Sequence, residues 1–133
     1  MGSWERWVDW LEDAEDDLAA ARELFRVGRY AKVCFLAQQA AEKALKALLM
    51  KRLGVYERTH SIAALIERVR RSVDVPGDLL DYGELLDRYY VPSRYPNAWP
   101  SGSPSRRLKE SDARAALEAA VRILEYVKGN IQA

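Results

Sequence analysis

Apolar residues recur at intervals of three and four along most of this 133-residue chain, and no segment alternates apolar and polar residues for long enough to form a strand. This spacing collects the apolar side chains on one face of an α-helix. The chain is therefore predicted to be all-α. Its length and its 49% hydrophobic content suit one core, so residues 1–133 are expected to form a single domain.

Five helices are predicted from this periodicity and from helix start and stop signals. Gly28 and Gly54 are expected to end the first two helices in the left-handed conformation, and Pro76 suits the first turn of the fourth. The predicted helices cover residues 4–25, residues 29–53, residues from about 61 to 71 or 72, a segment from Pro76 that stops before Pro92, and a last segment capped by Ser111 or Asp112. Two long helices joined by a short turn favour an up-down antiparallel bundle with a proline-rich loop before the last helix.

The second predicted helix is apolar over more than half of its circumference, and its alanines allow a neighbouring helix to approach closely. This excess of apolar surface predicts a subunit interface, and a homodimer is the expected assembly. Glu42 and Lys46, an acid four residues before a base, are interpreted as an ordinary helical pair.

Two features bear on where the protein works. No apolar run approaches the roughly 20 residues needed to span a bilayer. Residues 1–20 carry seven acidic side chains against the single base Arg6, whereas a signal peptide begins with basic residues. A cytoplasmic location is therefore expected.

The sequence also argues against metal and cofactor sites. Cys34 is the only cysteine, which excludes an internal disulfide and a multi-cysteine zinc site, and its apolar neighbours predict a core position. The acidic residues between positions 12 and 17 are interpreted as a solvated helical face. The chain contains no Walker loop, no GxGxxG after a strand and no HExxH, so we expect neither a cofactor nor a metal.

The segment from Arg88 to Lys109 differs from the rest of the chain because it combines cations, aromatic rings and four prolines and contains no acidic residue. Guanidinium groups pair with phosphate oxygens, and aromatic faces stack on bases, so the mixture suits a nucleotide or a single-stranded nucleic acid. The alternative is a stiff crossover loop whose aromatic side chains cap the bundle. The cations are Arg88, Arg94, Arg106, Arg107 and Lys109, and the aromatic residues are Tyr89, Tyr90, Tyr95 and Trp99.

His60 is the only histidine, so a two-histidine mechanism or metal site is excluded within one chain, although a dimer would supply a second copy. It stands at the start of the third predicted helix, where a neutral imidazole can bond a backbone group. A structural role is favoured over a chemical one.

Three stretches together resemble the HEPN family, the higher eukaryote and prokaryote nucleotide-binding domains, in its small free-standing archaeal and thermophilic bacterial form. They are CFLAQQAAEKALKALL in the second predicted helix, THSIAALI in the third, and LLDRYYVPSRYPNAWPSG after the fourth. The resemblance covers nearly the whole chain. It implies a helical bundle that dimerises and binds nucleotides or RNA, and a partnership with a minimal nucleotidyltransferase that resembles a toxin–antitoxin pair.

The family that this chain resembles includes many metal-independent ribonucleases, whose site is an Arg-x(4–6)-His motif duplicated across the dimer. This sequence departs from it, because Arg58 is separated from His60 by one residue and Arg52 by seven. Enzymatic activity by the family mechanism is therefore not expected.

The resemblance implies a ligand surface made of the residues that match its stretches. Among them Arg94 is predicted to bind phosphate, because Pro92 and Pro96 restrict its segment, and Tyr95 is predicted to stack on a base. The full predicted set is Gln39, Lys43, His60, Arg88, Tyr89, Tyr90, Arg94 and Tyr95.

Two other functions stay open. One is a ribonuclease in which two His60 side chains act across the dimer axis with Arg58 or Arg88. The other is a protein-interaction module without catalysis, in which the tyrosines of the loop are interface anchors.

Overall fold

The computed structural model describes residues 3–132, so Met1, Gly2 and Ala133 of the predicted domain lie outside the described residues. Every regular element in this range is helical, which confirms the all-α prediction. The elements are, in chain order, η1 (Ser3–Arg6), α1 (Trp7–Arg26), α2 (Tyr30–Leu53), α3 (Ile62–Arg70), α4 (Gly77–Asp87), η2 (Pro96–Ala98), α5 (Pro104–Arg107) and α6 (Glu110–Asn130).

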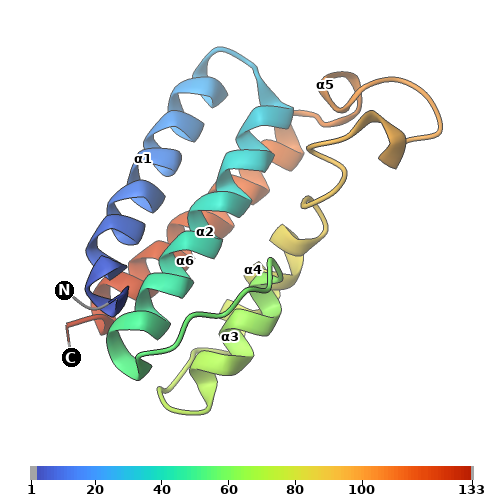
Figure 1. The fold of residues 1–133 in the computed structure, drawn as a ribbon. Helices are drawn as coiled ribbons and strands as arrows, with labels where there is room; N and C mark the ends of the chain where they lie inside the picture. Colours follow the sequence, from blue (N-terminus) through green and yellow to red (C-terminus); the bar gives the residue numbers. More distant parts are fainter. Residues whose placement is uncertain (1–2, 133) are drawn as a thin grey trace.

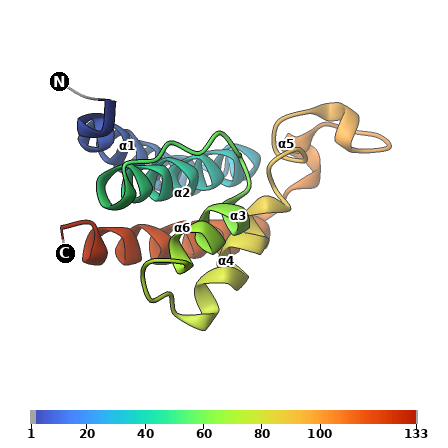
Figure 2. The same ribbon diagram turned by 60° about the horizontal axis from the view of Figure 1, so that its bottom comes forward.

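The three long helices form the body of the bundle. Helices α1 and α2 run side by side in opposite directions, and α6 lies along α2 and also contacts α1 (Figures 1 and 2). The shorter helices α3 and α4 pack against each other and against α2 and α6 near one end, while the loop with η2 and α5 extends past the start of α2 at the other end. This is the up-down bundle that the periodicity predicts.

Helix boundaries follow the local signals closely. Gly28 and Gly54 have φ angles of 81° and 64°, as predicted for the left-handed ends of α1 and α2. The first helix begins as the 3₁₀ turn η1 and becomes α-helical only at Trp7. The last helix starts at Glu110, slightly before the predicted cap, and the Asp112 carboxylate accepts a hydrogen bond from the Lys109 backbone N–H at 2.9 Å.

The prediction of a dimer surface on α2 rested on an apolar excess that the chain covers by itself. Helix α2 packs against α1, α3 and α6, and also contacts α4 and α5. Its alanines at 37, 40, 41 and 44 have no exposed surface, and most of its other apolar side chains are also buried. The apolar stripe is wide because α2 is the central helix, and it does not identify a subunit interface. Over residues 3–132 the structure contains no helix that is both long and apolar enough to cross a membrane.

Candidate functional site

Three polar residues on α2 face inward. Gln38, Glu42 and Lys46 are four residues apart, so they form one stripe along the helix, and their exposed fractions are 0%, 6% and 2%. The Lys46 Nζ donates to the Glu42 Oε2 at 3.0 Å, and the Gln38 Nε2 donates to the Glu42 Oε1 at 3.3 Å. The pair interpreted from the sequence as ordinary is thus a buried ion pair, since the helix that carries it is covered on nearly all sides.

Lys46 is held in an aromatic environment. Its Nζ lies 5.9 Å from the centre of the Trp10 ring and 5.3 Å from that of Tyr56, and these two rings contact each other edge to face. The negative faces of the rings attract the cation. Together with the Glu42 carboxylate, they provide the favourable surroundings that a buried ammonium group requires.

His60 covers the Glu42 carboxylate from outside. Its Nδ1 lies 3.2 and 3.1 Å from the two carboxylate oxygens, and its side chain is 58% exposed, whereas that of Glu42 is 8% exposed. The His60 carbonyl also accepts a hydrogen bond from the Gln38 Nε2 at 3.0 Å, which fixes the backbone at the same place. A carboxylate at Nδ1 favours a proton on that nitrogen, so Nε2 is left as the free nitrogen of the neutral ring.

Arg94 lies next to this stripe and is held by two aromatic rings. Its guanidinium carbon is 4.4 Å from the centre of the Phe35 ring and 4.2 Å from that of Tyr90. Tyr90 in turn stacks on His60, with 5.2 Å between the ring centres and an angle of 17° between the planes. We call Phe35, Arg94, Tyr90 and His60 the aromatic–arginine stack.

The charge of Arg94 is not neutralised within the described residues. Its Nη2 donates to the neutral Gln38 Oε1 at 3.1 Å, its Nε is buried without a hydrogen-bond partner, and no carboxylate lies within ion-pair distance. A partly buried guanidinium without a counter-charge is costly unless a further acceptor binds it. Its fixed position and free charge therefore make Arg94 suited to an anionic ligand.

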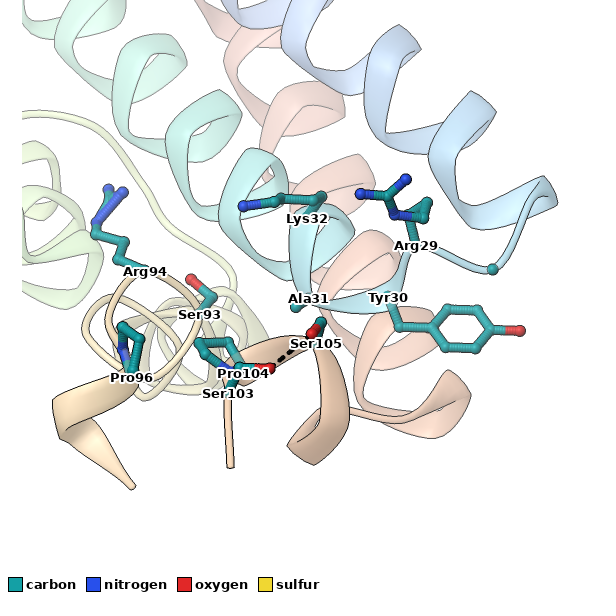
Figure 3. Close-up of a pocket in the computed structure, with 11 residues that line it drawn as sticks. Arg29, Tyr30, Ala31, Lys32, Ser93, Arg94, Pro96, Ser103, Pro104 and Ser105 are labelled. Carbon is teal, nitrogen blue, oxygen red and sulfur yellow. Dashed lines mark hydrogen bonds between the residues drawn. The ribbon is translucent and has the colours of Figure 1, made fainter. Parts of the chain in front are cut away.

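A cavity of about 420 Å³ opens between the start of α2 and the proline-rich loop. Figure 3 shows Arg29 and Lys32 on the α2 side and Arg94 on the loop side, with the Lys32 side chain extending in the direction of Arg94. The other lining residues are Gly28, Tyr30, Ala31, Ser93, Pro96, Ser103, Pro104 and Ser105.

The loop around this cavity is held by its own polar contacts. The Trp99 Nε1 donates to the Pro92 carbonyl at 2.9 Å, and the Arg107 Nε donates to the Ser101 carbonyl at 2.8 Å. The Lys109 Nζ donates to the Arg106 carbonyl at 2.9 Å. Arg107 and Lys109 therefore close the loop, which distinguishes them from Arg94.

The structure brings some of the predicted ligand residues together. Arg94, Tyr90 and His60 meet in the stack, and the Gln39 Nε2 donates at 2.9 Å to the same Gln38 oxygen that binds Arg94. Tyr95 directly follows Arg94 in the sequence and is 55% exposed, so its ring is available to solvent.

Other predicted residues are engaged elsewhere or isolated. The Lys43 Nζ pairs with the Asp13 and Asp17 carboxylates of α1 at 2.6 and 2.8 Å. The Tyr89 hydroxyl donates to the Asp112 Oδ1 at 3.0 Å, and burial together with this carboxylate raises the Tyr89 pKa above its usual range. Arg88 and Arg58 are exposed.

The acidic face of α1 includes residues that do more than contact solvent, because Asp13 and Asp17 bind Lys43. Among residues 3–132 no three histidine, cysteine or acidic side chains come together as metal ligands.

Sequence reasoning did not single out Phe35, Gln38 or Glu42 as parts of a site, nor Arg29 and Lys32 at the cavity. The sequence offered one sign of the buried residues: Gln38, Glu42 and Lys46 are polar and lie four residues apart on an otherwise apolar helix. Polar groups on a buried face must pair with one another. Nothing in the sequence places Arg29 and Lys32 opposite Arg94, because their meeting depends on the path of the loop.

Residues 7–130 match the model of the HEPN domain family. Among known proteins, "Putative toxin MJ1304" of Methanocaldococcus jannaschii is 27% identical over 127 residues, which cover 89% of this chain and 83% of that protein.

Solved structures of similar fold come from thermophiles and archaea. TT1696 from Thermus thermophilus superposes with a TM-score of 0.89 at 43% identity and covers 94% of this chain and 98% of its own. ST0689, described as an archaeal HEPN homologue, gives 0.78 at 41% identity, with 98% and 99% covered. An HEPN domain protein from Thermotoga maritima gives 0.73 at 30% identity, with 91% and 95% covered.

Proposed function

The chain belongs to the HEPN domain family, and from this membership we propose that it binds a nucleotide or an RNA segment at the aromatic–arginine stack. The observation that carries the proposal is Arg94, a guanidinium fixed between Phe35 and Tyr90 that lacks a carboxylate partner among the described residues. Its remaining N–H groups bind phosphate oxygens, and the exposed Tyr95 ring stacks on a base.

The biological setting we propose is a toxin–antitoxin-like pair in the cytoplasm. Support comes from the relative named as a putative toxin, which shares most of its length with this chain. In this setting the chain acts as a homodimer whose partner is a minimal nucleotidyltransferase. Copurification of the neighbouring gene product, and sedimentation of the purified protein at the mass of two chains, test the partner and the dimer separately.

Arg94→Ala tests the binding site directly. The substitution removes the charge and both stacking contacts, so the affinity for ATP or a short single-stranded RNA is expected to fall by about 1.5–3 kcal/mol in calorimetric titrations. Arg94→Lys keeps the charge but loses the planar fork and is expected to recover only part of the loss.

The control is Arg71→Ala, which removes an exposed arginine at the end of α3. It lies outside the stack, so binding should stay at the wild-type level. If neither ATP and other nucleotides nor short RNAs give saturable binding to the wild-type protein, the proposal is wrong.

A second candidate function, ribonuclease activity, is favoured by the contact between Glu42 and His60. With Nδ1–H directed at the carboxylate, Nε2 can accept the proton of a ribose 2′-hydroxyl. The 2′-oxygen then attacks the adjacent phosphorus, the bond to the 5′-oxygen breaks, and that oxygen takes a proton from the other protomer's imidazolium or from water. Arg58 or Arg88 would contact the phosphate in this reaction.

Under this alternative, cleavage of a labelled RNA is expected to give a product with a 2′,3′-cyclic phosphate end. The cleavage should stop in His60→Ala and slow in Glu42→Gln. An RNA methylated at its 2′-oxygens should resist. Cleavage that continues unchanged in His60→Ala would contradict the alternative while leaving the binding proposal intact.

A further inference from the structure

The cavity beside α2 contains groups that neither the family resemblance nor the proposed function uses. Arg29 and Lys32 stand at the beginning of α2, and Ser103 and Ser105 stand at the beginning of α5. Arg94 lines the same cavity, so the cavity adjoins the aromatic–arginine stack (Figure 3).

The charge of the cavity is uniformly positive. Its lining contains three cationic side chains, Arg29, Lys32 and Arg94, and no acidic one. None of the three takes part in any of the ion pairs formed within the described residues. The three cations around the cavity repel each other, and a bound anion would attract each of them and offset that repulsion.

Hydroxyl groups complete the lining. The Ser103 and Ser105 Oγ atoms are 2.7 Å apart, so one hydroxyl donates its proton to the other. A hydroxyl has one donor and two acceptor positions, so the accepting serine keeps its own O–H for a ligand. The Ser93 hydroxyl is already committed, because it donates to the Tyr89 carbonyl at 2.6 Å.

We propose that this cavity binds a terminal phosphate group, the phosphomonoester at the end of a nucleotide or at the 5′ end of an RNA. The inference rests on the proposed function, since Arg94 serves both the stack and the cavity. A phosphomonoester carries about −1.5 to −2 charge at pH 7, whereas an internal phosphodiester carries about −1. Three cations without counter-charges therefore prefer the terminal group. The cavity volume of about 420 Å³ exceeds the needs of one phosphate and admits the attached sugar as well.

Two RNA oligonucleotides of the same sequence, one with a 5′-phosphate and one with a 5′-hydroxyl, test the inference. In fluorescence anisotropy, the wild-type protein should bind the 5′-phosphorylated RNA with a dissociation constant about tenfold to hundredfold lower than that for the 5′-hydroxyl RNA. This range is expected for added charge-assisted contacts. The double variant Arg29→Gln/Lys32→Gln should lose most of this preference, because only Arg94 of the three cations then lines the cavity. Both side chains are on exposed residues, so the fold should persist.

The matched control is Arg71→Gln, which removes an exposed cation outside the cavity and should keep the wild-type preference. A wild-type protein that binds both RNAs equally, or a double variant that keeps the full preference, would overturn the inference and leave the proposed function standing.

If neither these RNAs nor any nucleotide binds, the proposed function fails, and pyrophosphate then tests the cavity by itself. Saturable thermal stabilisation by pyrophosphate in the wild-type protein, lost in Arg29→Gln/Lys32→Gln, would still support an anion site. The absence of any pyrophosphate effect would then remove the cavity proposal too.

Discussion

At the residue scale, the most informative group is the buried pair of Glu42 and Lys46. A buried ion pair contributes little net stability, but removal of one partner leaves the other charge without compensation. Glu42 also fixes His60, and Gln38 connects this pair to Arg94. The buried pair therefore helps to hold His60 and Arg94 in place on the proposed binding face.

Lys46→Met is expected to lower the free energy of unfolding by about 3 kcal/mol, because the buried Glu42 carboxylate loses the ammonium group that pairs with it. Glu42→Gln/Lys46→Met should recover most of this loss, since no charge remains. Urea unfolding followed by circular dichroism measures both. Lys128→Met, which breaks the exposed pair with Glu15, should cost less than about 1 kcal/mol. Equal losses for Lys46→Met and Lys128→Met would show that the burial of the pair is unimportant.

Cys34 illustrates a residue whose chemistry is suppressed by its position. It has no exposed surface, and burial raises the pKa of its thiol from 9.0 to about 12. The folded state therefore binds this proton more tightly than the unfolded state, so the contribution to stability is present below pH 9 and is lost as the pH rises toward 12.

We expect Cys34 to resist a disulfide reagent such as DTNB at pH 8 and to react fully in denaturant, because the thiolate is the reactive form. Absorbance at the product band measures the reaction. Fast reaction of the native protein would mean that the region around Cys34 opens readily.

At the scale of elements, the contact between α3 and α4 depends on a glycine and a carboxylate. Asp87, at the end of α4, accepts hydrogen bonds from the Ile62 and Ala63 N–H groups at 2.6 and 3.1 Å and so satisfies the start of α3. Gly83 lets the two helices approach closely, since a Cβ atom there would lie 2.7 Å from the Ile66 Cδ1 and 3.2 Å from the Ile62 Cγ2.

Gly83→Ala and Gly129→Ala should therefore have opposite effects, although both replace a helical glycine. At Gly129 a Cβ atom meets nothing within 4 Å, so the better helix propensity of alanine should stabilise by about 0.5 kcal/mol. At Gly83 overpacking costs about 1–3 kcal/mol, which outweighs the propensity gain. Thermal unfolding of the two variants decides. Stabilisation by Gly83→Ala would show that α3 and α4 can move apart freely.

At the scale of the whole molecule, the central position of α2 governs the expected behaviour. Because α2 contacts every other α-helix of residues 3–132, no part of the bundle has a core independent of it. We therefore propose that the chain is one cooperative unit and expect a single urea transition. Circular dichroism and tryptophan fluorescence should give the same midpoint. Separate midpoints would contradict the single domain.

Some features of the candidate site can be predicted from the sequence, and others are visible only in the folded structure. The residue types that bind phosphate and bases are visible in the segment from Arg88 to Lys109, and Arg94, Tyr90 and His60 were selected from the printed sequence alone. The sequence predicts Arg94 as the phosphate-binding residue, but only the structure shows how it differs from Arg107 and Lys109. Its guanidinium lies between two aromatic rings, whereas the other two side chains donate to loop carbonyls. That difference arises from contacts between residues that are close only in the folded loop.

The sequence by itself determined the all-α class, the approximate extents of the long helices and their order, because helix periodicity, glycine ends and proline starts are local properties of the chain. The tertiary structure alone decided that α2 is covered within the chain, that Glu42 and Lys46 are buried, and that Arg29 and Lys32 face Arg94 across a cavity. These are relations between distant segments. They depend on how the helices pack and how the loop returns, which no local pattern encodes.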